Sequence, residues 1–225
     1  MRVVGGSWRG RPLSAPAGRG TRPTSDKVRE AVFDVLGALP ETRAAALAAP
    51  ETGEAGEAEG PLAGHLALDL FAGSGALGIE ALSRGAGSCT FVESAPPALR
   101  ALRGNLARLG VPVVRPAAPA PPPGRHAVVL AADARKALAA DARRHARYTL
   151  VFADPPYDLY EQIRPALVRL LGRVLAPGAV LVVESAAGTA AGLPWAVVRE
   201  KRYGDTRVTF LVARAAPPAE GEPAD

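Results

Sequence analysis

The sequence is poor in cysteine and in long hydrophobic runs. Cys89 is its only cysteine, so the chain can form neither an intramolecular disulfide nor a cysteine-based zinc site. The longest stretch without a charged residue, 185–198, has 14 residues and contains two glycines and a proline, which makes it too short to span a bilayer. The first residues also lack the apolar segment of a signal peptide. We therefore expect a protein of the reducing cytoplasm without a membrane helix.

Aromatic residues make up only 5% of the chain, while 48% of its residues are hydrophobic and 22% are charged. These fractions are typical of globular proteins and exclude a wholly disordered or collagen-like chain. A length of 225 residues allows one full domain with small additions. No nucleophile-and-base pair and no cluster of metal ligands is evident. We assign Cys89 to the core, place the three histidines on the surface or in loops, and expect no metal.

The positive charge is concentrated at the N-terminus. Residues 1–30 contain seven basic and two acidic side chains, which accounts for the whole formal net charge of +5. Arginines interleaved with glycines can follow a phosphate backbone, because guanidinium forms bidentate bonds to phosphate. The alternative is a solvated, flexible terminus in a protein that uses 24 arginines and three lysines. The candidate nucleic-acid ligands are Arg2, Arg9, Arg11, Arg22 and Arg29.

Short apolar runs alternate with helical patterns from residue 62 onward. Such alternation predicts parallel strands joined by crossover helices, because helices then bury both faces of the sheet. We expect a doubly wound α/β fold, with a mostly parallel seven-stranded sheet that ends in an antiparallel hairpin. The expected strands are 66–71, 90–93, 127–130, 148–153, 179–184, 195–201 and 207–213, and the expected helices are 77–84, 98–109, 134–147 and 160–174.

Composition divides the chain into four parts. Residues 1–39 form a small N-terminal extension, a basic arm followed by a docking helix, because residues 24–36 combine a possible helix cap with one apolar stripe. Residues 40–61 are rich in alanine, glycine and glutamate and are expected to be a flexible linker. Residues 62–214 form the main domain, with a proline-rich insert at 115–124, and residues 215–225 form a disordered tail.

A glycine-rich turn follows the first expected strand. The sequence 68–78, LDLFAGSGALG, runs from an apolar strand through a glycine turn into a helix, which lets backbone approach a nucleotide-like cofactor. Glu93 ends the next strand, where a carboxylate can accept bonds from ribose hydroxyls. The turn fits both NAD and S-adenosylmethionine, and an acid inside the strand favours the second, because it can hold the methionine ammonium or order the loop. The candidate ligands are Asp69, Phe71, Gly73, Ser74, Gly75 and Glu93.

The fourth strand ends in an Asp-Pro-Pro-Tyr sequence. The prolines fix the backbone and remove donors, which leaves carboxylate and carbonyl acceptors beside an aromatic ring. These groups suit an exocyclic amine on a planar base: two acceptors bind its N–H groups while the ring stacks on the base. The alternative is a purely structural role, as a rigid turn with a buried tyrosine. The candidate catalytic residues are Asp154, Pro155, Pro156 and Tyr157.

Asp133 follows the third strand and has two open roles. It could accept a hydrogen bond from the adenine amino group, with the Ala134 amide beside it, or it could cap the next helix.

In this order, the glycine loop, Glu93, Asp133 and segment 154–157 resemble the class I methyltransferases that modify exocyclic amines. Segments 2–11 (RVVGGSWRGR) and 22–30 (RPTSDKVRE), together with segment 199–210 and its Tyr-Gly-Asp-Thr turn, resemble the RsmD-type 16S rRNA guanine-N2 methyltransferases. The similarity covers most of residues 1–214. The segment 40–61 and the proline-rich insert depart from it.

The resemblance implies a Rossmann-like class I fold and an enzyme that transfers a methyl group from S-adenosyl-L-methionine, leaving S-adenosyl-L-homocysteine. The acceptor would be the N2 amine of a flipped guanine in small-subunit rRNA, presented in a partly assembled ribosomal subunit. A cytoplasmic monomer is expected. The resemblance also implies that Thr24 and Arg29 belong to a segment that closes over the methionine end of the cofactor.

Three alternatives stay open at this point. An adenine-N6 methyltransferase acting on DNA or RNA shares the Asp-Pro-Pro-Tyr sequence, although no separate target-recognition domain is evident. An NAD-dependent oxidoreductase would explain the glycines but not segment 154–157. A non-catalytic assembly factor that binds rRNA would retain the basic arm without needing an intact cofactor pocket.

Overall fold

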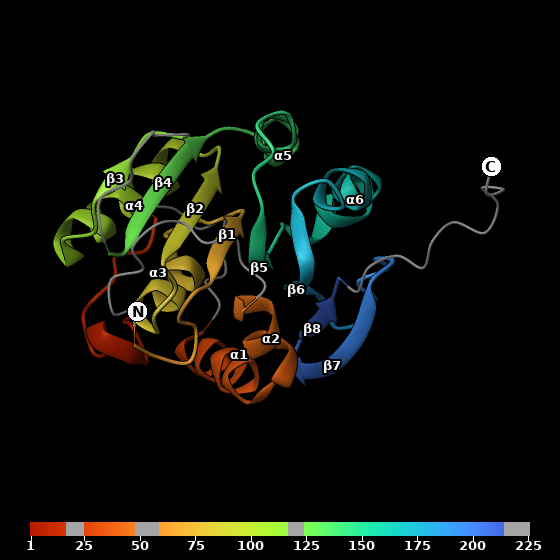
Figure 1. Ribbon diagram of the computed structural model, residues 1–225, viewed down its shortest axis with the longest axis horizontal. Helices are drawn as coiled ribbons and strands as arrows, with labels where there is room; N and C mark the ends of the chain where they lie inside the picture. Colours follow the sequence, from red (N-terminus) through yellow and green to blue (C-terminus); the bar gives the residue numbers. More distant parts are fainter. Residues whose placement is uncertain (17–24, 48–58, 117–123, 214–225) are drawn as a thin grey trace, which may run out of the picture.

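The computed structural model describes residues 1–16, 25–47, 59–116 and 124–213. Its centre is an eight-stranded sheet with the order β3-β4-β2-β1-β5-β6-β8-β7 (Figure 1). All neighbouring strands are parallel except β8, which is antiparallel to both β6 and β7. The strands are β1 (Leu66–Leu70), β2 (Ser88–Glu93), β3 (Val113–Val114), β4 (His126–Ala131), β5 (Tyr148–Ala153), β6 (Leu175–Ala186), β7 (Ala196–Tyr203) and β8 (Thr206–Val212).

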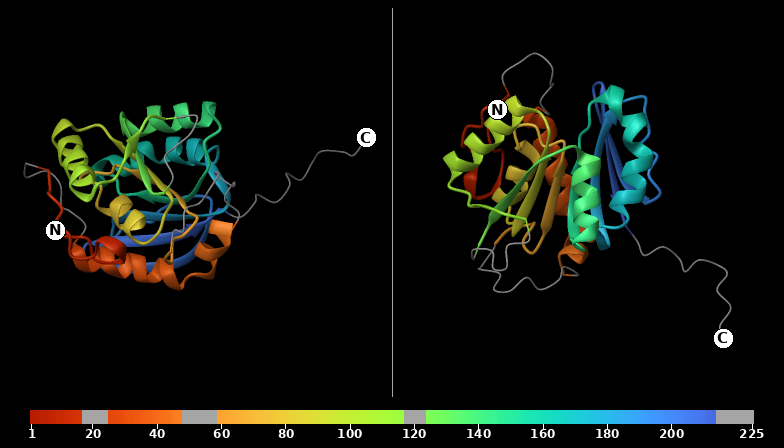
Figure 2. Two further views of the ribbon diagram at one scale, coloured as in Figure 1. Left: turned by 60° about the vertical axis from the view of Figure 1, so that its left-hand side comes forward. Right: turned by 90° about the horizontal axis from the view of Figure 1, so that it is seen from above.

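Helices cover both faces of this sheet (Figure 2). One face carries α1 (Asp26–Ala38), α2 (Pro40–Leu47), α3 (Ala76–Ser83) and α4 (Pro96–Leu109), and the other carries α5 (Ala134–Arg143) and α6 (Tyr157–Leu171). The central strand β5 shows how the sequence divides its residues between the faces. Leu150 and Phe152 pack with the first group of helices, whereas Val151 and Ala153 pack with the second. Successive side chains of a strand point to opposite faces, so a strand buried on both sides must be continuously apolar.

The predicted doubly wound α/β fold with its C-terminal hairpin is confirmed, but the predicted strand count is wrong. The structure adds β3, which pairs with β4 through Val113 and Val114. Two residues directly before a proline-rich segment give no alternation pattern, so the sequence could not reveal this strand. The insert itself falls mostly on residues 117–123, which lie outside the described residues, as does the tail from 214.

The prediction of a flexible linker over residues 40–61 is wrong for its first part. The first eight residues of this segment form helix α2, which packs against β6 and β5. Ala45 on this helix is fully buried. Alanine is the strongest helix former, so an alanine-rich segment next to an apolar sheet face folds onto it. Residues 48–58 lie outside the described part of the chain.

The first sixteen residues fold onto the domain. Val3 exchanges backbone hydrogen bonds with Arg11 and Gly10, at 2.9 and 2.8 Å, and the Leu13 amide donates to the Met1 carbonyl at 3.0 Å. A short 3-10 turn, η1 (Gly6–Trp8), closes this loop. Val3 and Leu13 are buried in the core. The segment is therefore not a flexible terminus, because its apolar side chains form part of the core.

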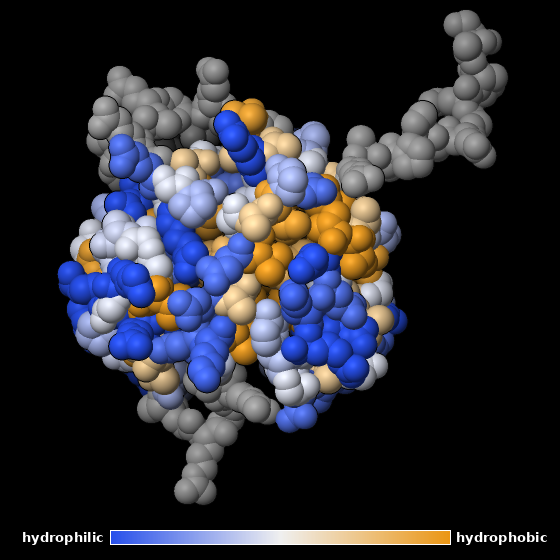
Figure 3. All heavy atoms as spheres, turned by 90° about the horizontal axis from the view of Figure 1, so that it is seen from below, coloured by the Kyte–Doolittle hydropathy of each residue, from blue (hydrophilic) through white to orange (hydrophobic). Residues whose placement is uncertain are grey.

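The expected docking helix is α1. The Ser25 side chain accepts a hydrogen bond from the Val28 amide, as an N-cap does. Val32, Phe33 and Leu36 are buried against the sheet, and the rings of Phe33 and Phe152 lie 5.5 Å apart. On the face shown in Figure 3, hydrophilic side chains gather over the outer side of α1 and over the edge strand β7. No helix in the described segments is long and apolar enough to cross a membrane.

Candidate active site

The glycine turn lies between β1 and α3, at the carboxyl edge of the sheet. Gly73 and Gly75 have φ values of 56° and 81°, in the left-handed region that favours glycine. A Cβ on Gly75 would lie 2.4 Å from the side chain of Leu102, so only glycine lets the turn approach α4 this closely. Phe71 also has a positive φ, 63°, which is uncommon for an aromatic residue. Such local strain is typical of functional turns.

Glu93 binds the glycine turn directly. It ends β2, next to β1, and its Oε2 accepts a hydrogen bond from the Gly73 amide at 2.8 Å. Its Oε1 accepts bonds from the Ser94 and Ala95 amides, both at 2.7 Å. Four lone-pair sites are available on a carboxylate, so these three bonds leave acceptor capacity for a further donor such as a ribose hydroxyl.

Asp69 is buried beneath the turn, where its Oδ2 accepts a hydrogen bond from the Gly78 amide at 2.9 Å. This contact supports the loop-ordering role, one of the two that the sequence left open. The pKa of Asp69 is raised to about 7, mainly by burial; the Gly78 hydrogen bond lowers it, and the negative charges of Asp154 and Glu93 contribute to the increase. The predicted carboxylates of three neighbouring strands therefore lie close enough to interact.

The Asp-Pro-Pro-Tyr segment follows β5, which pairs with β1 through Leu70 and Ala153. Asp154 is half-buried, and Tyr157 is the first residue of α6. Tyr157 is 42% exposed, and its hydroxyl lies 2.8 Å from Oγ1 of Thr206, the first residue of β8. The alternative of a buried structural tyrosine is therefore wrong for this residue.

Asp133 caps helix α5. Its carboxylate accepts a hydrogen bond from the Arg135 amide at 2.9 Å and forms an ion pair with the Arg135 side chain at 3.1 Å. The Arg135 side-chain hydrogen bond is the main cause that lowers the pKa of Asp133. The capping role is thus observed, and the role toward adenine stays a prediction. Ala134, which follows it, is buried.

Arg29 is a wrong prediction as a nucleic-acid ligand. Its side chain is completely buried, donates to the Arg2 carbonyl, and pairs with Asp26 at 2.9 Å. Glu80 of α3 lies 3.7 Å from its Nε. The side chain therefore cannot reach a phosphate, because it faces the interior of the domain rather than solvent. Arg2, Arg9 and Arg11 are exposed on the N-terminal segment, while Thr24 and Arg22 lie outside the described residues.

The sequence matches the family described as Conserved hypothetical protein 95 over residues 1–212. The chain belongs to this family. It is 35% identical over 213 residues to "Ribosomal RNA small subunit methyltransferase D" of Escherichia coli K12, covering 91% of this chain and 85% of that protein. It is 39% identical over 171 residues to "Putative rRNA methyltransferase YlbH" of Bacillus subtilis, covering 76% of this chain and 73% of the relative.

A solved structure agrees with these relatives. "Putative methyltransferase yhhF from Escherichia coli" superposes with a TM-score of 0.71 at 30% identity, covering 96% of this chain and 99% of that one. The predicted resemblance to RsmD-type methyltransferases and the Rossmann-like fold are thereby confirmed.

Asn105 supports the glycine turn, a role that the sequence analysis missed. It is fully buried on α4, and its Nδ2 donates to the carbonyls of Ser74 and Ser14, both at 3.0 Å. Its Oδ1 accepts a bond from the Ser14 amide at 2.8 Å. One side chain thus ties the glycine turn to the N-terminal segment. The available signal was a lone amide next to Leu106 on an otherwise apolar stripe.

His65 also differs from its expected surface position. It is buried, and its Nδ1 lies 3.0 Å from Oγ1 of Thr149. Burial lowers its pKa to about 4, which keeps the imidazole neutral near pH 7. In the described residues, no group of three or more His, Cys, Asp or Glu side chains is arranged to hold a metal ion.

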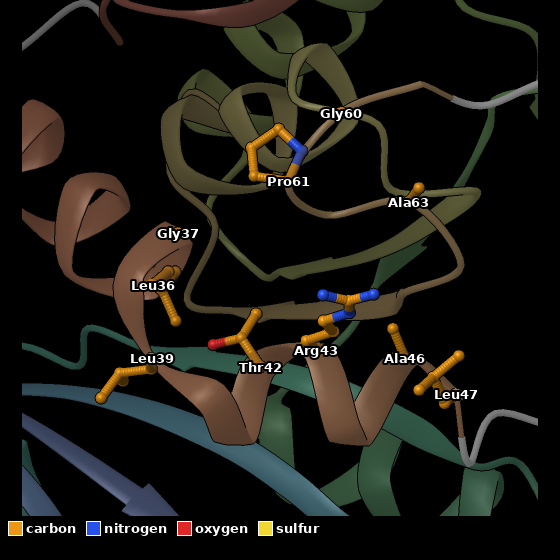
Figure 4. Close-up of a pocket in the computed structure, with 10 residues that line it drawn as sticks. All are labelled: Leu36, Gly37, Leu39, Thr42, Arg43, Ala46, Leu47, Gly60, Pro61 and Ala63. Atoms are coloured by element: carbon orange, nitrogen blue, oxygen red, sulfur yellow. The ribbon is translucent and has the colours of Figure 1, made fainter.

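A pocket of about 350 Å³ lies apart from these residues (Figure 4). It is formed by α1, α2 and the segment that leads into the amino end of β1, whereas the glycine turn leaves the carboxyl end of the same strand. The lining residues are Leu36, Gly37, Leu39, Thr42, Arg43, Ala46, Leu47, Gly60, Pro61 and Ala63. None of the predicted site residues takes part in it.

Proposed function

We propose that this protein transfers a methyl group from S-adenosylmethionine to the N2 amine of a guanine in small-subunit rRNA. The observation that carries the proposal is the convergence of the glycine turn, Glu93 and the segment 154–157 at the carboxyl ends of the adjacent strands β2, β1 and β5. A nucleotide-like group and a planar base can be held side by side at such an edge.

The cofactor side of the site fits S-adenosylmethionine. A Cβ on Gly73 would meet no atom closer than 4.0 Å, so the turn offers open space beside its backbone. In the proposal, Gly73 and Gly75 border the methionine part and Glu93 accepts a ribose hydroxyl with its remaining lone pair. Asp133 and the Ala134 amide face the adenine. When bound, the cofactor supplies an electrophilic methyl group.

The acceptor side fits an exocyclic amine. Guanine N2 is a poor nucleophile because its lone pair is delocalised into the ring. The Asp154 carboxylate and the Pro155 carbonyl accept the two amine N–H bonds, which become stronger as the nitrogen becomes pyramidal and positively charged. Asp154 then receives the proton that the nitrogen loses. The exposed ring of Tyr157 stacks on the flipped base.

The relatives named as small-subunit rRNA methyltransferases support rRNA as the substrate. The exposed Arg2, Arg9 and Arg11 on the folded N-terminal segment supply charge for phosphate contacts. We further propose that the target is presented in a partly assembled small subunit and that the protein acts there as a monomer.

One experiment separates this function from its rivals. Purified protein with labelled S-adenosylmethionine should methylate small-subunit particles, and nucleoside mass analysis of the product should give N2-methylguanosine. N6-methyladenosine would identify the adenine enzyme instead. No transfer, together with NAD binding in calorimetry, would identify an oxidoreductase, and rRNA binding without affinity for either cofactor would identify an assembly factor.

A further inference from the structure

The turn between β7 and β8 lies beside the proposed base-binding site, and the proposed function assigns it no role. Ala153, the last residue of β5, pairs with Val183 of β6, and Ala186 of the same strand pairs with Thr206. Thr206 therefore lies three residues farther along β6 than the end of β5, about 10 Å beyond it. That position is the carboxyl edge, from which the segment 154–157 emerges.

Thr206, the first residue after this turn, contacts Tyr157. Its ring is well exposed for an aromatic residue, so packing alone restrains it weakly. The hydrogen bond between its hydroxyl and Oγ1 of Thr206, 2.8 Å long, joins α6 to the hairpin. A tyrosine hydroxyl can donate or accept such a bond, whereas phenylalanine at the same position can do neither.

The turn that carries the Thr206 hydroxyl is itself firmly held. The Ala187 amide donates to the Asp205 carbonyl at 2.8 Å. The Ala187 carbonyl accepts bonds from Arg207 Nε and Nη2, at 3.2 and 2.9 Å, and from Arg202 Nη2 at 2.8 Å. Gly204, with φ of 60°, permits the two-residue loop between the strands. Residues on both sides of Thr206 are thus fixed to the end of β6.

We propose that Thr206 is a positioning residue for base binding, whose hydroxyl holds the Tyr157 ring in the orientation that stacks on the target base. The inference rests on the proposed function, since it concerns the same base. An exposed ring that is free to rotate loses conformational entropy when a base stacks on it. A ring already fixed by a rigid neighbour avoids that cost. The C-terminal hairpin thereby helps to shape the substrate site, because it carries the hydroxyl that orients the Tyr157 ring.

A double-mutant cycle tests this proposal. Thr206→Val keeps the side-chain shape and removes the hydroxyl, and Tyr157→Phe removes the other partner. Each should lower kcat/KM for the rRNA substrate about 2- to 10-fold, the effect of one net hydrogen bond. The double variant should be no worse than either single variant, because one bond can be lost only once. Thr206→Ser, which retains the hydroxyl, should restore most of the activity.

The controls separate positioning from a structural role. Affinity for S-adenosylmethionine and the melting temperature should stay near wild type in all these variants. Thr189→Val removes a threonine hydroxyl from the neighbouring 187–189 segment and should leave kcat/KM unchanged. Losses that add in the double variant, or a fully active Thr206→Val, would overturn the proposal. If Thr206→Val does not fold, a fully active Tyr157→Phe has the same consequence.

Failure of the proposed function gives a different result. In that case the wild-type protein itself shows no methyl transfer to guanine, and the double-mutant cycle has no kcat/KM values to compare. An active wild type with an additive cycle removes only the role of Thr206.

Discussion

Glu80 of α3 accepts a hydrogen bond from the backbone amide of Val4 at 2.8 Å. The carboxylate is completely buried and is also bonded to Arg84 Nε at 2.8 Å, with Arg29 Nε 3.7 Å away. One acid therefore joins the N-terminal segment, α1 and α3. Removing this buried carboxylate should be costly, because the positive charges beside it would lose the negative charge that compensates them inside the protein.

Glu80→Ala should destabilise the protein by about 3 to 5 kcal/mol, the usual effect of removing one partner from a buried ion pair. The buried Arg29 side chain would then lose Glu80 and keep only its ion pair with Asp26 among the acids in the described part of the chain. Chemical denaturation monitored by circular dichroism measures the loss. Glu161→Ala removes an exposed pair with Arg164 and serves as the control, with an expected loss below about 1 kcal/mol. Equal losses in the two variants would contradict the role of Glu80.

The exposed arginines of the N-terminal segment should control how RNA affinity depends on salt. Each phosphate contact contributes about 0.7 to 0.9 to the slope of log K against log salt. Replacing Arg2, Arg9 and Arg11 by Gln should therefore flatten the slope by about 2 to 3. The melting temperature should change little, since all three residues are exposed. Filter binding to small-subunit rRNA at several salt concentrations measures the slope.

A matched control and a truncation complete this test. A triple Gln variant of exposed arginines on α5, on α6 and after α6 changes the net charge equally and should leave the slope as it is; its positions are Arg143, Arg169 and Arg173. Deleting residues 1–13 should instead lower the melting temperature, because Val3 and Leu13 leave the core. If the first triple variant keeps the wild-type slope, the RNA surface lies elsewhere.

Local patterns predicted the segments that meet at the candidate site, and contacts between distant segments decided how the rest of it is held. The glycine turn, Glu93 and segment 154–157 each stand at the end of an apolar strand, and parallel strands bring such ends to one edge. Arg29 was misassigned because a charge count contains no information about its buried partner Glu80. Asn105 was missed because its partner Ser14 lies in a segment whose folded state the sequence did not reveal.

Helix α2 and strand β3 were missed for a related reason. Both are short, and their stability comes from packing on the sheet rather than from a pattern in their own residues. The role of Asp133 shows a different limit, since one carboxylate at a strand end can cap a helix and also face a ligand. Geometry identifies the cap, and only a ligand can test the other role.

Asp69 should make stability depend on pH. Its pKa is about 7 in the folded protein and 3.8 in the unfolded chain, so between these values the folded state binds more protons. Stability from this group is therefore lost as pH rises from about 4 to 7. Relative to Asp69→Asn, the wild type should lose about 2 to 3 kcal/mol between pH 5 and pH 8. Urea denaturation of both proteins at these two pH values measures the difference, and parallel pH curves would refute the assignment.

Asp154→Asn should abolish most methyl transfer while leaving cofactor affinity unchanged. The amide can still occupy the position after β5, but it lacks the negative charge that strengthens the bond to the amine in the transition state. Losing a charge-assisted bond of this kind costs about 2 to 4 kcal/mol, which corresponds to a rate about 30- to 1000-fold lower. Single-turnover kinetics on small-subunit particles measure the rate, and calorimetry with S-adenosylmethionine measures affinity. Asp158→Asn, on the exposed first turn of α6, changes the same charge nearby and should keep wild-type turnover. If Asp154→Asn also keeps it, the carboxylate takes no part in the transfer.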